Sequence, residues 1–233
     1  ISFDQQIFKR IVEFGWPLMI NAVLMFFVYQ GDKFIIGAYY DIEKLGVYSA
    51  AFMLTMAPAL LVSRVLNSII LPFFSKKQDD LKQLNASYLH STEITILIIS
   101  AYTVFFTLYG GAALALVFGK HFQGNAELMA ALGVLWSLRI LRVPATLLAM
   151  SRGHTKVGLT ANIFRSFAIF GVFYFSIRQY PIELIAYIGC GGELLAVLIT
   201  LIQIKHKYGS QYQLFSPNVW LFLFSVITSM IYI

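Results

Sequence analysis

The sequence predicts an all-α protein, a polytopic bundle of transmembrane helices with six complete membrane helices and a truncated seventh. The first observation is composition, because 59% of the 233 residues are hydrophobic and only 12% are charged, whereas about a quarter of a soluble domain is charged. The second is the recurrence of apolar stretches long enough to cross about 30 Å of hydrocarbon. The third is that short polar connectors separate these stretches, which predicts antiparallel packing of successive helices.

The expected N-terminal element covers residues 1–13 and is an amphipathic helix on the cytoplasmic face of the membrane. Phe3, Ile7, Ile11 and Phe14 follow one another at steps of three or four, with charged residues between them. Such a stripe is typical of a helix that lies in the membrane interface. The pattern leaves one alternative open, in which this segment is a cytoplasmic extension of the first span.

A six-helix transmembrane lobe is expected over residues 14–208. Its spans are expected at Phe14 to Tyr40, Leu45 to Phe74, Thr92 to Phe118, Leu128 to Met150, Val157 to Ile177 and Ile182 to Ile204. Residues 209–233 are expected to begin a further membrane helix near Pro217, which the end of the sequence cuts short. Since the sequence also lacks an initiator Met, we expect it to be a fragment of a longer protein.

Basic residues predict the orientation, because Lys and Arg accumulate on the cytoplasmic side of membrane proteins. If the first span starts in the cytoplasm, nine basic residues lie on that side: Lys9, Arg10, Lys76, Lys77, Lys82, Arg152, Lys156, Lys205 and Lys207. Three lie on the opposite side: Lys44, Lys120 and Arg178. The asymmetry predicts a cytoplasmic start for the first span.

Charged residues inside the spans are the candidate functional residues. Arg139 and Arg142 share one span, where each costs about 2.5 to 3.5 kcal/mol near the membrane centre while a Leu, Ile or Val returns only about 0.3 to 0.6. They should therefore face the bundle interior or a hydrated cavity. Arg64 and Arg165, on two other spans, each have Asn and Ser neighbours on the same helical face.

Two accounts of these charges stay open. The spans hold an excess of three positive charges, from five cations and two anions: Lys33, Arg64, Arg139, Arg142, Arg165, Asp32 and Glu193. In one account, the charges pair with one another or extend to the membrane edge, which we expect for Lys33 and Arg165. In the other, the excess positive charge binds an anionic ligand, which we favour for Arg139, Arg142 and Arg64.

Each carboxylate also has two interpretations. Glu193 is a candidate proton-coupling group if it is buried alone, and a structural partner if an arginine lies beside it. Asp32 is expected to form a salt bridge with Lys33 or with a neighbouring helix, in preference to binding an ion.

Two backbone features belong with these charges. Pro144 follows the paired arginines and should bend their helix, because proline removes a helical hydrogen bond. Gly189, Gly191 and Gly192 beside the buried carboxylate are expected to permit close helix packing.

Several functional classes are disfavoured. The single cysteine, Cys190, excludes an intrachain disulfide and is expected to be a packing residue. The four histidines lie at predicted loops or helix ends, and no paired carboxylates or metal-ligand spacing occurs, so we predict no catalytic residue, metal site or cofactor. The net charge of +6 is scattered among apolar runs, which argues against nucleic-acid binding.

Three stretches resemble a known family. Residues 14–54, FGWPLMINAVLMFFVYQGDKFIIGAYYDIEKLGVYSAAFML, resemble the seventh helix and following turn of bacterial polysaccharide flippases of the O-antigen type. The positions that carry this resemblance are Pro17, Leu18, Asp32, Lys33, Gly37, Leu45, Gly46, Tyr48 and Ser49. Residues 117–132, VFGKHFQGNAELMAAL, and residues 150–165, MSRGHTKVGLTANIFR, resemble the segments that lead into the tenth and eleventh helices. These loose motifs are shared across the multidrug/oligosaccharidyl-lipid/polysaccharide exporter superfamily.

The resemblance implies the C-terminal lobe of a two-lobe transporter in the bacterial cytoplasmic (inner) membrane. Its implied substrate is an undecaprenyl-pyrophosphate-linked oligosaccharide, translocated by alternating access, and Arg139, Arg142, Arg64 and Arg165 are the candidate contacts. Implied partners are the lipid-linked oligosaccharide, membrane lipids, and a polysaccharide polymerase with its chain-length machinery. A multidrug/cation antiporter of the same superfamily is the alternative, and a membrane-embedded glycosyltransferase or polymerase is a weaker one.

Overall fold

The computed structural model describes residues 5–154, 156–209 and 217–231, and every regular element in these ranges is a helix. The long helices are α1 (Gln5–Tyr39), α2 (Ile42–Ser75), α3 (Leu81–Phe118), α4 (Ala126–Leu141), α5 (Val143–Ser151), α6 (Lys156–Ser166), α7 (Ala168–Ile177), α8 (Ile182–Tyr208) and α9 (Pro217–Ile231). A short 3-10 helix, Lys120–Phe122, lies between α3 and α4. The predicted all-α membrane bundle is confirmed.

Five segments among the described residues are long and apolar enough to cross a membrane by composition and length: α2, α3, α8, and the combined segments α4–α5 and α6–α7. The first expected span lies in α1 and is not one of these five. The number of complete spans therefore stays a prediction. Residues 5–13 continue without a break into the rest of α1, and how this part lies relative to the membrane also stays a prediction.

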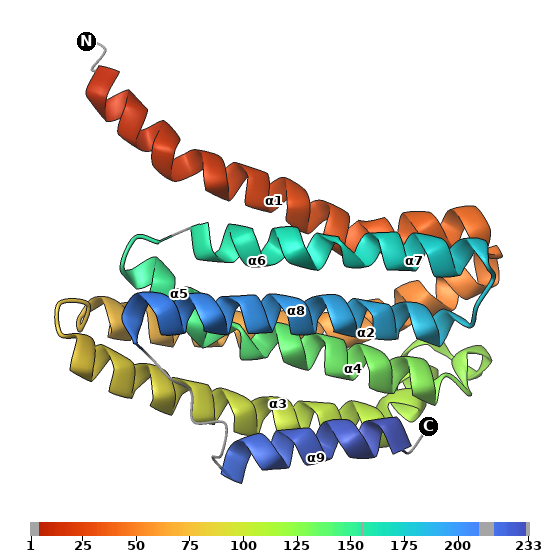
Figure 1. Ribbon diagram of the computed structural model, residues 1–233. Coiled ribbons are helices and arrows are strands. Elements are labelled where there is room, and N and C mark those ends of the chain that lie inside the picture. The colour runs from red at the N-terminus through yellow and green to blue at the C-terminus, as the bar shows by residue number, and fades with distance from the viewer. Residues whose placement is uncertain (1–4, 155, 210–216, 232–233) are drawn as a thin grey trace.

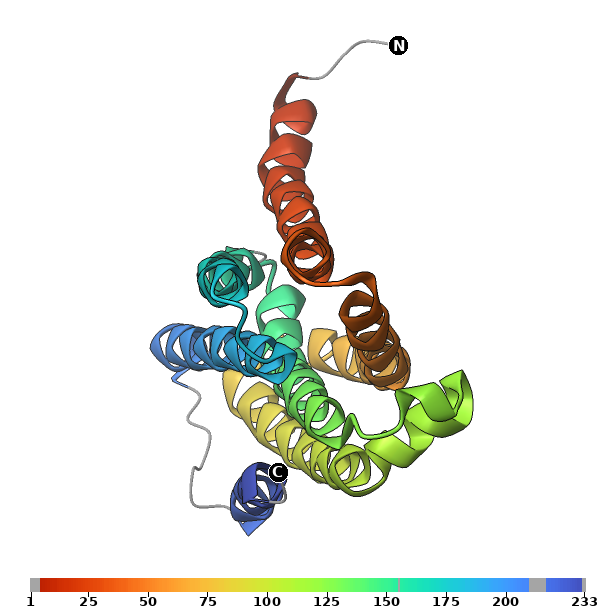
Figure 2. The ribbon, with the colours of Figure 1, turned by 90° about the vertical axis from the view of Figure 1, so that its right-hand side faces the viewer.

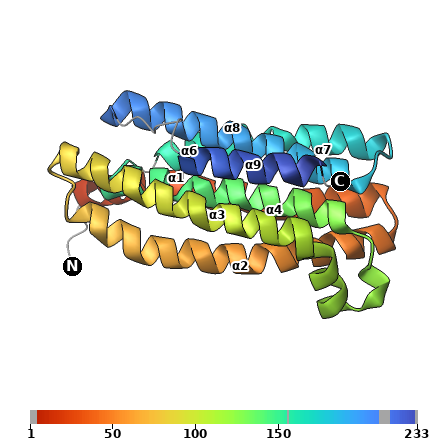
Figure 3. The same ribbon diagram turned by 90° about the horizontal axis from the view of Figure 1, so that it is seen from below.

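The helices lie side by side, with α4 at the centre (Figures 1 and 2). Every residue from Leu128 to Leu138 is buried, as expected for a helix that is apolar on all sides. In Figure 3, seen from below, α2 and α3 run along one side of α4 while α8 lies on the other. The centre of the bundle is aromatic, because Trp136 on α4 stacks on Tyr29 of α1 at 5.8 Å and meets Phe52 of α2 edge-on at 5.5 Å.

Two of the expected spans are interrupted. The span at 128–150 breaks after Leu141, where Pro144 lies in the first turn of α5, as the proline predicts. The span at 157–177 breaks at Phe167 although neither proline nor glycine is present there. The Ser166 hydroxyl donates to the Asn162 carbonyl oxygen at 2.8 Å, and such side-chain bonds to the preceding turn often bend helices.

Small residues set the distance of α8 from its neighbours. A Cβ atom added at Gly192 would lie 2.6 Å from the Ala168 Cβ and 3.2 Å from the Arg165 carbonyl oxygen. One added at Gly189 would lie 2.7 Å from a methyl of Leu135 on α4. The expected close packing is therefore found at these two glycines. Gly191 faces open space, so that expectation is wrong for it.

A candidate anion-binding site

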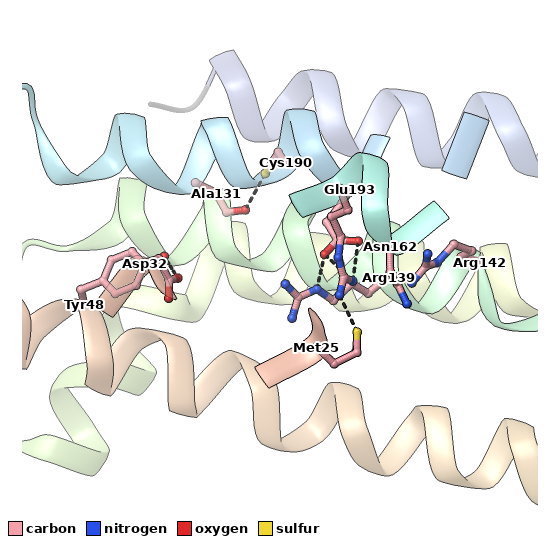
Figure 4. A network of polar contacts seen from close by, with 10 residues as sticks. Met25, Asp32, Tyr48, Ala131, Arg139, Arg142, Asn162, Cys190 and Glu193 are labelled. Carbon is pink, nitrogen blue, oxygen red and sulfur yellow. Dashed lines mark hydrogen bonds and ion pairs between the residues drawn. The ribbon is translucent and has the colours of Figure 1, made fainter. Parts of the chain in front are cut away.

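The site is centred on Glu193 of α8, whose side chain is 1% exposed. Its carboxylate accepts a hydrogen bond from Nε of Arg139 on α4. It also accepts from Nη1 of Arg165 on α6, at 3.0 Å to Oε1 and 3.3 Å to Oε2. The close contact of α8 with α6 at Gly192 brings Arg165 and Glu193 together. Figure 4 shows Glu193 beside Arg139 in the space between α4, α6 and α8.

Arg139 is held by aromatic rings as well as by the carboxylate. The centre of its guanidinium lies 4.4 Å from the ring centroid of Trp136, one turn earlier on α4, and 4.8 Å from that of Tyr29 on α1. Rings at this distance attract a cation through their quadrupole. The guanidinium is therefore fixed between three helices.

Arg142 and Asn162 extend the cluster toward the predicted cytoplasmic side. Arg142 caps the C-terminus of α4, and its Nη2 donates to Oδ1 of Asn162 on α6 at 2.9 Å. Arg165, one turn after Asn162, also places its Nη2 2.6 Å from the Sδ atom of Met25 on α1. Four helices thus contribute to one polar cluster.

The cluster holds more donors than the described residues satisfy. Three buried guanidinium nitrogens, Arg139 Nη1, Arg142 Nη1 and Arg165 Nε, have no hydrogen-bond partner among the described residues. Arg139 and Arg165 share the carboxylate of Glu193, while Arg142 donates to the neutral amide of Asn162, so three arginines and one carboxylate leave two formal positive charges in the cluster. Leaving a buried donor unpaired costs about 1 to 3 kcal/mol, and more when the donor is charged. An anion with several acceptor oxygens would satisfy these atoms.

A cavity of about 430 Å³ lies beside the cluster. Arg139, Arg165 and Glu193 line one part of it, and Asp32 and Tyr48 line another. The rest of its wall is mainly apolar and comes from α1, α2, α4, α6, α7 and α8. The charged groups are therefore accessible from a space large enough for a small ligand.

Asp32 is bound differently from the sequence-based expectation. Its Oδ2 accepts a hydrogen bond from the Tyr48 hydroxyl on α2 at 2.6 Å, and its Oδ1 accepts from the Lys33 backbone N–H at 2.8 Å. The Lys33 ammonium instead lies 4.3 Å from the ring centroid of Phe52. The predicted salt bridge to Lys33 is wrong, because the lysine side chain turns toward an aromatic ring of α2.

Comparison with known proteins identifies the family. The family model described as "Polysaccharide biosynthesis protein" matches residues 1–127, just over half of the chain. The chain belongs to the polysaccharide biosynthesis protein family. It is 25% identical to the amylovoran biosynthesis protein AmsL of Erwinia amylovora over 168 residues, which cover 72% of this chain and 43% of the relative. It is 21% identical to the teichuronic acid biosynthesis protein TuaB of Bacillus subtilis (strain 168) over 155 residues, covering 66% of this chain and 32% of the relative.

The matched region spans less than half of the length of these curated relatives. No solved structure gives a significant match to the chain. The resemblance read from the sequence to a polysaccharide flippase-type protein is thus confirmed at the level of the family. The helices and the family together make this a multi-pass membrane protein.

The family-like positions lie in α1 and at the turn into α2. Gly37 faces Leu45, and a Cβ added at Gly37 would lie 3.2 Å from the Leu45 Cδ2 atom. Asp32 and Tyr48 form the hydrogen bond described above, which joins the two helices. Pro17 lies within α1, but its side chain is outside the described part of the structure.

The structure brings together most of the predicted arginines. Arg139, Arg142 and Arg165 share the cluster, and Glu193 takes the structural alternative by pairing with two of them. Of the two possibilities in the account expected for Arg165, the structure shows pairing with another charge and not extension to the membrane edge, since its side chain is 3% exposed and faces the carboxylate. Arg64 is exposed on α2 and does not join the cluster, so its role as a binding residue stays a prediction.

Two residues of the site, both on α1, were not predicted from the sequence. Met25 and Tyr29 contact the arginines although nothing in an apolar helix marks which of its faces is turned inward. Their spacing of four residues puts them on one face together with Asp32. That face could have been found from Asp32 alone, by reading one and two turns back along the helix.

Proposed function

We propose that the protein is a flippase that moves an undecaprenyl-diphosphate-linked oligosaccharide across the bacterial cytoplasmic membrane. Its family and its membrane-helix architecture support a role in polysaccharide transport. The observation that carries the proposal is the set of three buried guanidinium groups with unpartnered nitrogens around one carboxylate.

A diphosphate supplies the acceptor oxygens that this cluster lacks. Phosphate oxygens accept charge-assisted hydrogen bonds from guanidinium groups, often two at a time. In this proposal, Arg139 and Arg165 bind the diphosphate when it occupies the cavity. Arg142, one turn after Arg139, contributes a further contact to the diphosphate. Glu193 serves as their internal counter-ion when no substrate is bound, which lowers the cost of burying the arginines.

Transport by alternating access requires the diphosphate to be bound and then released on the other side. A site with an excess of two positive charges binds a multivalent anion, and a change in cavity exposure would weaken that attraction by admitting water. Asp32, with its hydrogen bonds from Tyr48 and Lys33, is the carboxylate we propose for coupling to an ion or proton gradient.

The proposed function implies several partners. The lipid-linked oligosaccharide is the cargo, membrane lipids surround the helices, and a polysaccharide polymerase with its chain-length machinery would receive the product. The protein itself performs no covalent step in this account. A cation antiporter fits the site less well, because three arginines with one carboxylate leave a net positive charge in the cluster, which repels a cation.

The test is complementation of a bacterial strain that lacks its polysaccharide flippase. Arg139→Gln and Arg142→Gln should each reduce surface glycan while the lipid-linked oligosaccharide accumulates on the cytoplasmic side. Arg178→Gln is the matched control, because Arg178 caps the far end of α7 and is exposed. Normal export by both cluster variants, at unchanged membrane levels, would show that these arginines do not bind the cargo.

A further inference from the structure

Basic residues gather at one end of the bundle, which is the end predicted to face the cytoplasm. In Figure 1, the α2–α3 turn, the α5–α6 turn and the C-terminal end of α8 all lie at this end. Seven residues form what we call the basic end: Lys76, Lys77, Lys82, Arg152, Lys156, Lys205 and Lys207. The same segments hold two acidic residues, Asp79 and Asp80. They therefore carry an excess of five positive charges.

The two carboxylates do not neutralise this charge. Among the described residues, no side chain of the basic end forms an ion pair with a carboxylate. Asp80 is used within its own turn, where its Oδ1 accepts from the backbone N–H groups of Lys82 at 3.0 Å and Gln83 at 3.1 Å. Its Oδ2 accepts from Nε2 of Gln83 at 2.8 Å. The positive charge of the basic end is therefore left for a ligand or for solvent.

Tyr208, the last residue of α8, joins the turns of this end. Its hydroxyl is hydrogen-bonded to Nδ1 of His154, and its backbone oxygen accepts from Nδ2 of Asn85 on α3 at 3.2 Å. The centre of the Arg152 guanidinium lies 5.8 Å from the centroid of the Tyr208 ring. Nη1 of Arg152 also donates to the backbone oxygen of Gln78 in the α2–α3 turn, at 2.8 Å. The turns are thus held in one arrangement.

Two positive charges converge at this point. Burial lowers the pKa of His154, and the positive charges of Lys207 and Arg152 lower it further. Both charges therefore act on the same imidazole. Lys207 is exposed and Arg152 is partly exposed, and a guanidinium has five N–H donors, of which the bond to Gln78 uses one. An anion with several oxygens can contact both side chains.

The basic end lies where membrane spans end. The apolar segments α2 and α8 end at Ser75 and Tyr208, and α3 begins at Leu81. Residues just beyond such a span lie in the headgroup layer of the bilayer. The Lys77 ammonium lies 4.1 Å from the ring centroid of the exposed Phe73, an arrangement suited to that layer because the lysine stem and the ring are apolar while the charge stays in water. Lipid phosphates are therefore the anions within reach.

We propose that the basic end binds the headgroup of an anionic phospholipid, phosphatidylglycerol, with Arg152 and Lys207 as the contacts to its phosphate. This lipid is a neighbour in the bilayer and not the cargo, so the inference goes beyond the proposed function and does not rest on it. Each basic residue near an anionic membrane surface contributes about fivefold in affinity. The Tyr208 ring and the Gln78 carbonyl hold Arg152 in place, which lowers the entropy lost on binding.

The test is lipid retention by the purified, delipidated protein in detergent. The protein is incubated with equal amounts of phosphatidylglycerol and phosphatidylethanolamine that have the same acyl chains, captured and washed. The lipids that remain are extracted and quantified by mass spectrometry. We expect the wild type to retain phosphatidylglycerol in clear excess over phosphatidylethanolamine, whose headgroup has no net charge.

Variants test the two contacts. Lys207→Gln should lower the ratio of retained phosphatidylglycerol to phosphatidylethanolamine about fivefold, and the double variant with Arg152→Gln about 20-fold. Lys207→Arg keeps the charge and should behave like the wild type. The matched control is the double variant Lys44→Gln, Lys120→Gln, which removes the same charge from exposed residues at the opposite end of the bundle. Lys44 also lies over a ring, 5.5 Å from the centroid of Tyr40.

Three results would overturn the inference. Equal retention of the two lipids by the wild type would mean that the basic end does not select an anionic headgroup. An equal loss in the control double variant would mean that net charge alone attracts the lipid. Release of phosphatidylglycerol by an excess of inorganic phosphate in the wash would mean that the contacts form a site for a soluble phosphate. Because Lys207 is exposed, its single variants should fold normally, so the result does not depend on the stability of the double variant.

Discussion

Replacing Glu193 by Gln tests whether its carboxylate balances the charge of the buried arginines. The side chain is 1% exposed and accepts hydrogen bonds from Arg139 and Arg165. Glutamine keeps the size of the side chain but removes the charge, so the two guanidinium groups lose their counter-ion. Removing one partner of a buried ion pair costs about 3 to 5 kcal/mol, and we expect a loss of stability in that range.

The assay is unfolding of the purified protein in mixed detergent–SDS micelles, followed by circular dichroism. Glu183→Gln is the control, because Glu183 lies in the first turn of the same helix, where a charge contributes about 0.3 to 1 kcal/mol. The double variant with Arg165→Gln should be more stable than Glu193→Gln alone, since it removes the uncompensated charge as well. Diphosphate should stabilise Glu193→Gln more than the wild type, by about 1.4 kcal/mol for each tenfold gain in affinity at saturation.

The reasoning would be refuted if Glu193→Gln were no less stable than Glu183→Gln. That result would mean that the carboxylate does not balance the arginines. The reasoning would also be contradicted if diphosphate stabilised Glu193→Gln and the wild type equally, because the ligand would then bind away from the cluster.

Three further predictions concern the surroundings of the site. Tyr48→Phe removes the hydrogen bond to Asp32 and should lower the unfolding free energy by about 0.5 to 1.5 kcal/mol, measured in the same SDS titration. Gly192→Leu forces α8 away from Ala168, where even a Cβ would lie at 2.6 Å, and should cost about 1 to 3 kcal/mol; an unchanged midpoint would contradict the tight contact. Burial lowers the pKa of His154, in the loop before α6, below its usual 6.5, so the unfolded chain binds the extra proton first as the pH falls below about 6.5. Stability should therefore decrease from that pH down to the lowered pKa, and His154→Gln should flatten this part of the stability curve.

The sequence was sufficient for the helical fold and for the break at Pro144. Long apolar runs are helices in a bilayer because each backbone group must be satisfied within its own segment. A proline interrupts such a helix for local reasons that do not depend on its neighbours. The break at Phe167 could not be predicted, because no proline or glycine marks it and the bond from Ser166 to the Asn162 carbonyl oxygen has the same form as the bond from Ser100 to Ile96 in the unbroken helix α3.

Which face of each helix points into the bundle was harder to predict, and the site depends on these orientations. In a soluble helix the apolar stripe marks the inward face, but a membrane helix is apolar toward both lipid and neighbours. The cost of burying Arg139 predicted that it points inward, and it does so. The same cost did not distinguish Arg64 from Arg165, because both have polar neighbours on one face, yet only Arg165 meets a carboxylate.

The central claim is that the arginine cluster binds a phosphate-bearing anion, and calorimetric titration with inorganic diphosphate tests it most directly. The wild-type protein should bind diphosphate with an affinity that falls as salt is raised. Arg139→Gln should weaken binding about 10- to 100-fold, as expected for the loss of one charge-assisted hydrogen bond, while Arg178→Gln should bind like the wild type. Absence of binding to the wild-type protein, or equal affinities for the wild type and Arg139→Gln, would contradict the account.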